Sequence, residues 1–337
     1  MTTRIGINGF GRIGRDFLRV VRTSGDLEVV AVNDLTQPRT LAHLLTYDST
    51  FGRLDAQVGW DQSHITVDGR RIRATAEPDP AKLDWGGLGV DVVIESTGRF
   101  RSRDQAALHL KAGARKVIIS APAKGEDATI VMGVNQDMYD PDRHDVLSAA
   151  SCTTNCVVPM VKVLHDAFGI QRGFMTTVHA YTGDQVLLDF PHTDLRRARS
   201  GAVNIIPTTT GAARAAALVI PDLRGRLDSI ALRVPVEDAS LTDLAVVLDR
   251  QATAEEINQA FQAAAEGPLR GILRCTSDPI VSRDVIGDPH SCVLDASLTQ
   301  ANATLAKVFG WYDNEWGYTN RLADLTLLVA RHRTDDR

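Results

Sequence analysis

The chain has 337 residues, 44% hydrophobic and 23% charged, so it is long enough for two domains and has the composition of a globular protein. A formal net charge of −5 gives no electrostatic reason to expect a nucleic acid or a membrane as a partner. Four cysteines without paired spacing predict neither a disulfide framework nor a metal site. A strand pattern begins at once, without an apolar signal core, so we expect a cytoplasmic protein.

The first elements in chain order have the pattern of a dinucleotide-binding unit. Residues 4–8 predict a strand, Gly9-Phe10-Gly11-Arg12-Ile13-Gly14 follows, and a helix pattern continues through residues 16–21. A second predicted strand, residues 28–33, ends at Asp34. The glycine pattern alone is weak, but the strand before it, the helix after it and the acid at this distance favour nucleotide binding.

Each glycine of this loop has a physical role. Gly9 permits a tight turn, Gly11 lets the backbone approach a pyrophosphate, and Gly14 lets the helix pack closely on the strand. The N-terminus of the helix presents N–H groups to the phosphate charge. Asp34 would accept hydrogen bonds from the adenosine ribose and repel a 2′-phosphate, so NAD is the expected cofactor.

Apolar runs alternate with helical patterns through the rest of the first half. A helix is predicted over residues 102–112, and strands are predicted over residues 90–95, 116–120, 129–132 and 146–148. This alternation predicts a parallel, doubly wound sheet. Four histidines without motif partners are interpreted as packing or surface residues: His43, His64, His109 and His144.

A candidate nucleophile follows the last of these strands. Ala150-Ser151-Cys152-Thr153-Thr154-Asn155-Cys156 precedes apolar residues at helical spacing, which places Cys152 at or near a helix start. The helix dipole favours a thiolate there, so we expect a lowered pKa of Cys152. Cys156 is interpreted as a packed neighbour of the nucleophile, and Cys275 and Cys292 as structural residues.

A strand predicted over residues 174–182 carries His179 and Thr182 to one edge. A histidine beside a helix-start cysteine activates that cysteine as a nucleophile. A single histidine at a strand end is more often structural. From these residues alone, a catalytic and a structural role of His179 therefore both stay open.

The chain resembles the phosphorylating, NAD-dependent glyceraldehyde-3-phosphate dehydrogenases. The segments that carry the resemblance lie in order along nearly the whole chain: Asn8-Gly9-Phe10-Gly11-Arg12-Ile13-Gly14-Arg15, Ser96-Thr97-Gly98-Arg99-Phe100, Ala150-Ser151-Cys152-Thr153-Thr154-Asn155, Thr177-Val178-His179-Ala180-Tyr181-Thr182, Asp194-Leu195-Arg196-Arg197-Ala198-Arg199, Ile206-Pro207-Thr208-Thr209-Thr210-Gly211-Ala212-Ala213 and Trp311-Tyr312-Asp313-Asn314-Glu315. The resemblance implies a catalytic role for His179.

The implied reaction is the oxidation of D-glyceraldehyde 3-phosphate to 1,3-bisphosphoglycerate through a thioester on Cys152. His179 would act as the base and help to hold the oxygen charge of the first adduct, alongside the Cys152 backbone N–H. Inorganic phosphate would then attack the thioester. The expected partners are therefore glyceraldehyde 3-phosphate and inorganic phosphate.

The resemblance also implies the binding residues, and no metal is among the ligands. The C3 phosphate of the substrate would be bound by Thr182 and Arg233. The attacking phosphate would be bound by Ser151, Thr153, Arg197, Thr210 and the Gly211 backbone. NAD would be bound by Gly9, Gly11, Arg12, Ile13, Gly14, Asp34 and Ser120, with Asn314 on the nicotinamide amide and Tyr318 near the ring.

The implied fold is α/β, with a doubly wound, Rossmann-type NAD-binding domain and an α+β catalytic domain. The first domain would consist of residues 1–151 and 315–337, so that a C-terminal helix over residues 316–331 returns to it. The catalytic and subunit-contact domain, residues 152–314, would have a mostly antiparallel sheet. Members of the family assemble as homotetramers, and the same is expected here.

The chain departs from the family after Arg233, where a neutral stretch is replaced by Val236-Glu237-Asp238. Acids that faced Arg233 would weaken phosphate binding, whereas the alternation of side chains along an extended chain can turn them away. Phe51 and Ser200-Gly201 depart as well, which we interpret as lineage variation or as marks of a specialised isoenzyme.

Two other functions stay as alternatives. Erythrose-4-phosphate dehydrogenase would share the cysteine, the histidine and the cofactor, but it would hydrolyse the thioester; the residues for the attacking phosphate speak against it. A non-catalytic binding protein on the same fold belongs to another class, and the presence of both Cys152 and His179 speaks against it.

Overall fold

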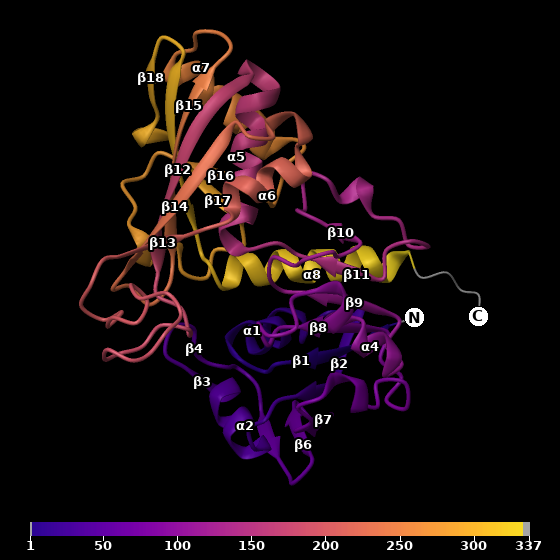
Figure 1. The fold of residues 1–337 in the computed structure, drawn as a ribbon. Helices are drawn as coiled ribbons and strands as arrows, with labels where there is room; N and C mark the ends of the chain where they lie inside the picture. Colours follow the sequence, from indigo (N-terminus) through magenta and orange to yellow (C-terminus); the bar gives the residue numbers. More distant parts are fainter. Residues whose placement is uncertain (1, 333–337) are drawn as a thin grey trace. The chain divides into compact units, whose positions relative to one another are not determined.

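The computed structural model describes residues 2–332, which form two compact units. Unit 1 comprises Met1–Ile130, Asn135–Ala150 and Thr319–Arg337, and unit 2 comprises Val131–Val134 and Ser151–Tyr318. Figure 1 follows the chain by colour. Among the described residues, no helix is long and apolar enough to cross a membrane.

Unit 1 contains a nine-stranded sheet that is parallel through its centre. Its strand order is β10 (Ala128–Thr129), β11 (Val146–Ser148), β9 (Lys116–Ile119), β8 (Val92–Glu95), β1 (Thr3–Asn8), β2 (Leu27–Asn33), β7 (Arg70–Thr75), β6 (His64–Val67) and β5 (Val58–Trp60). Pairing is parallel from β10 to β7 and antiparallel from β7 to β5. The doubly wound sheet predicted from the sequence is confirmed.

Besides residues 319–331 of the C-terminal helix, unit 1 contains short helices, turns and a hairpin. They are α1 (Arg12–Val21), α2 (Pro38–Thr46), α3 (Arg103–Ala106), α4 (Leu108–Lys111), η1 (Pro80–Lys82), η2 (Gln136–Met138) and the hairpin of β3 (Tyr47–Asp48) and β4 (Gly52–Arg53). The helix predicted over residues 102–112 is thus two short helices, the first capped by the Ser102 side chain. The strand predicted over residues 129–132 is wrong in its bounds: the observed strand, β10, covers Ala128–Thr129, and Val131 already belongs to unit 2.

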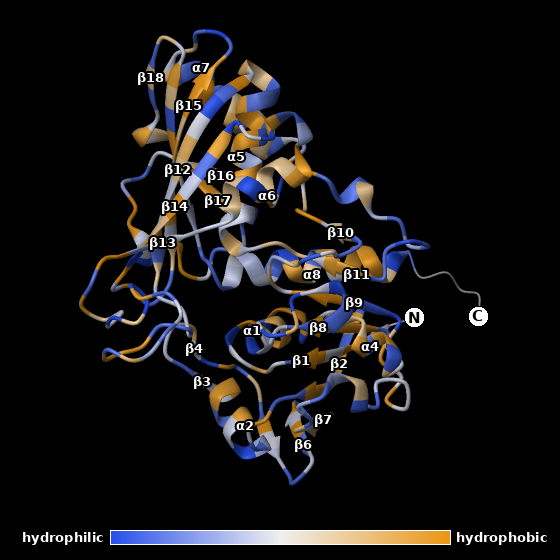
Figure 2. Ribbon diagram, viewed as in Figure 1, coloured by the Kyte–Doolittle hydropathy of each residue, from blue (hydrophilic) through white to orange (hydrophobic). Residues whose placement is uncertain are grey.

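The central strands of unit 1 are buried on both faces, as their continuous apolar sequence requires. Figure 2 shows them as mostly hydrophobic. Val93, Val117 and Val146, from three neighbouring strands, pack in one cluster with Trp85. The Trp85 indole N–H donates to Nδ1 of His109 at 2.9 Å, and Nε2 of His109 lies 3.0 Å from Glu95. His109 is therefore a packing residue, as interpreted from the sequence.

Unit 2 contains an eight-stranded, mostly antiparallel sheet. Its order is β13 (Ile206–Thr209), β14 (Leu227–Val234), β12 (Ile170–Ala180), β15 (Ser240–Leu248), β19 (Leu305–Tyr312), β17 (Cys292–Asp295) and β16 (Leu273–Thr276), with β18 (Gln300–Asn302) paired to β19. Only two of the pairs between its described strands, β12–β14 and β16–β17, are parallel. The predicted α+β character of this part of the chain is confirmed.

Four helices and three short turns accompany this sheet along the chain. They are α5 (Cys152–Phe168), α6 (Ala212–Val219), α7 (Ala254–Glu266), α8 (Trp316–Arg331), η3 (Pro221–Leu223), η4 (Ser282–Val285) and η5 (Ala296–Leu298); the boundary between the units falls in the first turn of α8. The long strand β12 places His179 directly opposite Arg233 of β14 in the parallel register. Helix α5 starts at Cys152, as predicted; Ser151 is its N-cap, and the preceding Ala150 lies in the left-handed region at φ 56°.

Substitution of the glycines in the loop between β1 and α1 tests how closely this helix packs against the loop. A Cβ on Gly14 would lie 2.3 Å from the carbonyl oxygen of Gly9, whereas a Cβ on Gly11 would meet nothing within 4 Å. Overpacking costs about 1–3 kcal/mol, so we expect Gly14→Ala to lower the free energy of unfolding by about 2 kcal/mol. Gly11→Ala should change it by less than about 0.5 kcal/mol. Urea unfolding of both variants measures the difference, and equal values would contradict the packing described here.

Candidate active site

The glycine loop of unit 1 forms a turn that brings backbone N–H groups to one edge of the sheet. Gly9 has φ 92°, a left-handed conformation that favours glycine, and its N–H donates to the Asn33 carbonyl at 2.8 Å. Helix α1 begins at Arg12, with Gly11 as its N-cap and no side-chain cap. Space for an anion is therefore left at the start of the helix, where the dipole favours it.

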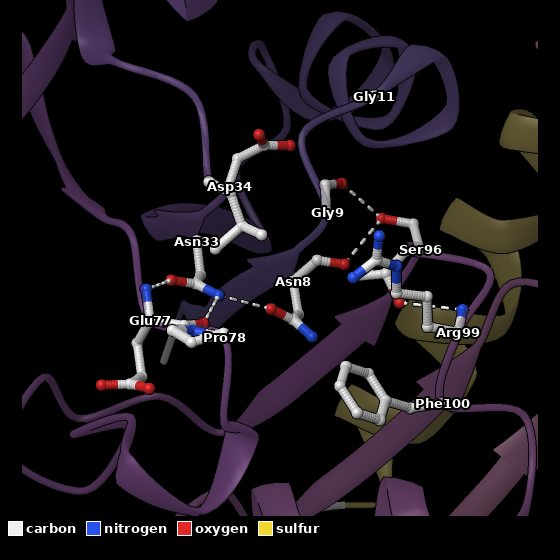
Figure 3. Close-up of a pocket in the computed structure, with 12 residues that line it drawn as sticks. Asn8, Gly9, Gly11, Asn33, Asp34, Glu77, Pro78, Ser96, Arg99 and Phe100 are labelled. Atoms are coloured by element: carbon white, nitrogen blue, oxygen red, sulfur yellow. Dashed lines mark hydrogen bonds between the residues drawn. The ribbon is translucent and has the colours of Figure 1, made fainter.

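A pocket lies beside this loop (Figure 3). Asp34 lines it from the end of β2, and its carboxylate accepts the N–H groups of Phe10 at 2.9 Å and Thr36 at 3.0 Å. These two bonds use one lone pair on each oxygen, so a second pair stays available for ribose hydroxyls. The open glycine loop and the acid at the strand end thus fit a dinucleotide such as NAD.

The other predicted cofactor residues of unit 1 contribute less through their side chains. The Arg12 guanidinium binds Asp48 at 2.9 Å and lies 5.7 Å from the centroid of the Phe51 ring. Ile13 is half-buried in the first turn of α1. Ser120 follows β9, and its N–H donates to the Glu95 carbonyl at 2.9 Å. A phosphate at this edge would therefore meet the backbone of Arg12 and Ile13 rather than the Arg12 charge.

In unit 2 the two predicted catalytic side chains are in contact. Sγ of Cys152 lies 3.4 Å from Nε2 of His179. Cys152 is the first residue of α5 and is half-buried, while His179 near the end of β12 is only 3% exposed. The distance is within the reach of a hydrogen bond to sulfur, so a proton can move directly between the two groups.

Burial sets the resting charges of this pair. It raises the pKa of the Cys152 thiol to about 11, although the Arg233 charge and the Thr153 hydrogen bond act in the opposite direction. Burial and the Arg233 charge lower the pKa of His179 to about 3. The pair therefore rests as a neutral thiol beside a neutral imidazole. The lowered pKa of Cys152 expected from the helix start is wrong for this state, because desolvation outweighs the dipole.

Arg233 contacts the far side of the imidazole. Its Nη1 lies 2.9 Å from Nδ1 of His179 and donates to the Ala180 carbonyl at 2.9 Å and to the Thr182 hydroxyl at 3.2 Å. Nδ1 of His179 is also 2.7 Å from the Ala180 carbonyl. If Nδ1 carries the hydrogen, it donates to Ala180 and Nε2 offers its lone pair to the Cys152 thiol. That tautomer makes His179 a base toward Cys152.

Asp184 joins the predicted phosphate-binding residues of this region. Its carboxylate accepts a hydrogen bond from the Thr182 hydroxyl and another from Nη1 of Arg197 at 2.9 Å. Burial opposes ionisation, but the Thr182 hydrogen bond and the Arg197 and Arg233 charges lower the pKa of Asp184. A carboxylate thus lies among the same cations and hydroxyl that an anionic substrate would use.

The remaining predicted phosphate residues are engaged in local structure. Ser151 caps α5 by accepting the Thr154 N–H at 3.1 Å, and the buried Thr153 hydroxyl bonds to Tyr312 at 2.9 Å. The Thr210 hydroxyl accepts the Ala212 N–H at 3.3 Å, and Gly211 is the N-cap of α6. A phosphate at these positions would meet helix N-termini and would have to share these hydroxyls.

Asn314 and Tyr318 both lie in unit 2 and are buried. The Asn314 side-chain oxygen accepts a hydrogen bond from Ser240 at 2.7 Å, which leaves the amide N–H₂ to face a ligand. Ser240 in turn accepts the Ala180 N–H at 3.1 Å. Burial, followed by the charge of Cys152, raises the pKa of Tyr318 well above its usual value, so its ring belongs to the surroundings of the nucleophile.

Neither acid of the departing segment binds Arg233. Glu237 forms an ion pair with Arg283, and Asp238 is fully buried beside Asp313. The chain is bent, not extended, between the end of β14 and the start of β15, and both acids have partners other than Arg233, so neither acid weakens the predicted phosphate site by direct contact.

Three residues that sequence analysis did not single out contribute to this site. Asp184 could have been suspected, because it follows Thr182 at a distance of two residues. Ser240 and Tyr312 gave no sequence signal, since each acts on residues far away in the chain. Tyr312 bonds to Thr153 at 2.9 Å and to Thr177 at 2.8 Å, and its ring packs edge-on against His179.

The role of Arg233 can be tested at the thiol. Its positive charge stabilises a Cys152 thiolate, so Arg233→Ala should raise the pKa of Cys152. A rise of about one unit means about ten-fold less thiolate at neutral pH. The pH dependence of Cys152 alkylation by iodoacetamide measures this, with Arg233→Lys expected to restore most of the effect. Arg283→Ala removes a charge paired with Glu237 and should leave the profile in place. An unchanged profile in Arg233→Ala would contradict the assignment.

Family models match both halves of the chain. Residues 3–103 match the family model of the glyceraldehyde 3-phosphate dehydrogenase NAD-binding domain, and residues 151–314 match that of the C-terminal domain of the same family. The first match identifies NAD as the cofactor.

Curated relatives are similar over nearly the full chain. Glyceraldehyde-3-phosphate dehydrogenase of Streptomyces coelicolor is 60% identical over 333 residues, which are 98% of this chain and 99% of the relative. Glyceraldehyde-3-phosphate dehydrogenase 2 of Streptomyces avermitilis is 58% identical, and the enzyme of Geobacillus stearothermophilus 57%, each with 98% of this chain and 99% of the relative covered. The chain belongs to the glyceraldehyde-3-phosphate dehydrogenase family.

Proposed function

We propose that the protein oxidises D-glyceraldehyde 3-phosphate to 1,3-bisphosphoglycerate with NAD and inorganic phosphate, a reaction of glycolysis and gluconeogenesis. The observation that carries the proposal is the contact of 3.4 Å between Cys152 and His179, in a chain of this family. Residues 1–151 and 315–337 would be the NAD-binding domain, and residues 152–314 the catalytic and subunit-contact domain.

The chemistry starts from the neutral thiol–imidazole pair. As Sγ of Cys152 bonds to the aldehyde carbon, Nε2 of His179 takes the thiol proton, and this proton then neutralises the aldehyde oxygen. The product is a hemithioacetal. His179 would next remove the hydroxyl proton, and NAD, when bound, would supply the two-electron oxidant for C1. The carbon is now an acyl thioester on Cys152, and each proton has passed through one imidazole nitrogen.

The second half of the reaction needs two anions in one region. Arg233 and Thr182 would bind the C3 phosphate of the substrate, and Arg197 would bind the attacking phosphate with Ser151, Thr153, Thr210 and the Gly211 N–H. Arginine suits this role because its planar, permanently charged guanidinium can bind phosphate with two donors. Attack by a phosphate oxygen breaks the C–S bond, and the Cys152 sulfur leaves with the electron pair.

NAD would be held by the glycine loop and Asp34 on the adenosine side. The Arg12 and Ile13 N–H groups would meet the pyrophosphate, Ser120 would lie at the same edge, and Asn314 would hold the nicotinamide amide, with Tyr318 near the ring. The buried Ser240–Asn314 bond of 2.7 Å supports the orientation of that amide, because it occupies the oxygen and leaves the N–H₂ as donor.

The proposal predicts that the protein reduces NAD to NADH with glyceraldehyde 3-phosphate as substrate, and only when inorganic phosphate is present. The absorbance of NADH measures this reaction. Cys152→Ser should abolish turnover, because it removes the thiolate leaving group. His179→Asn should lower kcat about 10²–10⁴-fold, since it removes the proton acceptor.

A parallel assay with erythrose 4-phosphate distinguishes the proposed function from its main alternative. Preference for this tetrose, with a rate that does not depend on inorganic phosphate, would favour erythrose-4-phosphate dehydrogenase. No turnover on either aldehyde would favour a binding protein without catalytic activity.

We further propose a homotetramer in the cytoplasm. Two separate apolar surfaces of unit 2 support more than one subunit contact. One is the segment after β12, coloured pink in Figure 1, with Leu187, Leu188, Phe190 and Leu195 exposed by 66–81%. The other is the open face of the sheet, where Phe174 and Leu305 line one hollow. A reactive free thiol such as Cys152 suits a reducing compartment.

Light scattering after gel filtration tests the assembly. The wild type should have four chain masses, and Leu188→Asp or Phe174→Asp should each give smaller species, because a buried unpaired charge weakens an interface. Val281→Asp changes an apolar residue that is 58% exposed outside both surfaces and should keep the wild-type mass. A wild-type monomer would overturn the proposal.

A further inference from the structure

Two carboxyl groups are buried against each other in unit 2. Asp238 is 0% exposed and Asp313 is 1% exposed, and the two side chains share a hydrogen bond. Two carboxylates are both acceptors and cannot bond to each other without a proton between them. One of the two groups must therefore be a carboxylic acid in the native protein.

The surroundings decide which group holds the proton. The Asp313 carboxylate accepts three backbone N–H groups, from Gly287 at 2.7 Å, Glu315 at 2.9 Å and Trp316 at 2.6 Å. Asp238 accepts one, from Ala239 at 2.7 Å, and its Oδ2 is buried without a donor. Backbone N–H groups stabilise the ionised form, so Asp313 keeps the charge and Asp238 keeps the proton.

The charged groups near Asp238 agree with this assignment. Asp313 and Glu315 act on it, and both are acids that disfavour a second negative charge. Two arginines of the same unit are paired with other acids: Arg283 with Glu237, and Arg274 with Asp288. Among the residues that the structure describes, no group of three or more His, Cys, Asp or Glu side chains could hold a metal ion.

The Asp238–Asp313 pair lies next in sequence to the hydrogen bond between Ser240 and Asn314. Asp238 and Ser240 flank Ala239, and their partners, Asp313 and Asn314, are adjacent in the chain. Ala239 is buried with φ 65°, a left-handed conformation that is unfavourable for alanine by about 1 kcal/mol or more. Such a conformation persists only where its surroundings hold it, and here the two side-chain links hold it on both sides.

We propose that Asp238 is a positioning residue: the native protein keeps it as an uncharged carboxylic acid that donates its proton to Asp313, and this bond holds Asn314 in place for the nicotinamide amide. The part that concerns Asn314 rests on the proposed function, whereas the shared proton does not. The covalent chemistry stays with Cys152 and His179. The acid that replaces a neutral residue after Arg233 thus acts through Asn314 rather than on the phosphate.

The shared proton makes stability depend on pH in a definite direction. Burial and the Asp313 charge raise the pKa of Asp238 from 3.8 to about 9. Between these values the unfolded chain has lost a proton that the native protein keeps. The stability that Asp238 contributes is therefore fully present below about pH 4, falls as the pH rises and levels off above about pH 9.

The experiment compares Asp238→Asn with wild type. Asparagine keeps the shape, donates to Asp313 and accepts from Ala239, but it does not titrate. The Tm of Asp238→Asn minus that of wild type, measured without NAD, should grow steadily from about pH 5 to about pH 9 and then stay constant. Glu237→Gln is the matched control, because it removes the adjacent acid outside the pair, and its Tm difference should not follow this course. Parallel Tm profiles of wild type and Asp238→Asn would overturn the shared proton.

NAD affinity, measured by fluorescence quenching, tests the positioning role without relying on turnover. At neutral pH, Asp238→Asn should bind NAD within about two-fold of wild type, and Asp238→Ala should bind several-fold more weakly because it lacks the link. Above about pH 9 wild type should lose affinity relative to Asp238→Asn. If Asp238→Ala does not fold, the comparison of wild type with Asp238→Asn at alkaline pH still tests the positioning role. Equal affinities of the folded variants at every pH would overturn the positioning role, and failure of the proposed reaction would leave both measurements valid.

Discussion

The arrangement of the Cys152–His179 pair depends on the half-buried guanidinium of Arg233. One nitrogen of this group lies within 3.2 Å of the His179 ring, the Ala180 carbonyl and the Thr182 hydroxyl. Its charge disfavours an imidazolium and favours a thiolate, while burial opposes every charge in the region. His179 therefore stays neutral and Cys152 stays protonated until a carbon atom is present to be attacked. A substrate phosphate bound at Arg233 would partly cancel the charge, which links substrate binding to the proton affinity of His179.

Two carboxylates of unit 2 illustrate how the setting of an acid decides its state. Asp184 lies among Thr182, Arg197 and Arg233, and these partners outweigh burial and keep it ionised. Asp238 lies beside Asp313 without a cation, and burial keeps it protonated. The first acid bonds to the same side chains that the proposed function assigns to phosphate binding. The second can act as a hydrogen-bond donor, which a carboxylate cannot do.

Strand register explains why these groups meet. The parallel pairing of β12 with β14 places His179 beside Arg233, and the antiparallel pairing of β15 with β19 places Ser240 beside Tyr312. A shift of one residue in either pair would turn each of these side chains to the other face of the sheet. The geometry of the site is therefore a property of the whole sheet of unit 2.

Local patterns of the sequence by themselves determined the βαβ start, the glycine loop, Asp34 and the helix that begins at Cys152, because each depends on backbone preferences over a few neighbouring residues. The role of His179 stayed open from its own surroundings, and only the family resemblance favoured catalysis. Tertiary structure alone decided the rest: the partners of Asp184, Ser240 and Asp238, and the raised pKa of Cys152. The physical reason is that solvation and charge at a buried group depend on atoms from distant parts of the chain, which no local pattern encodes.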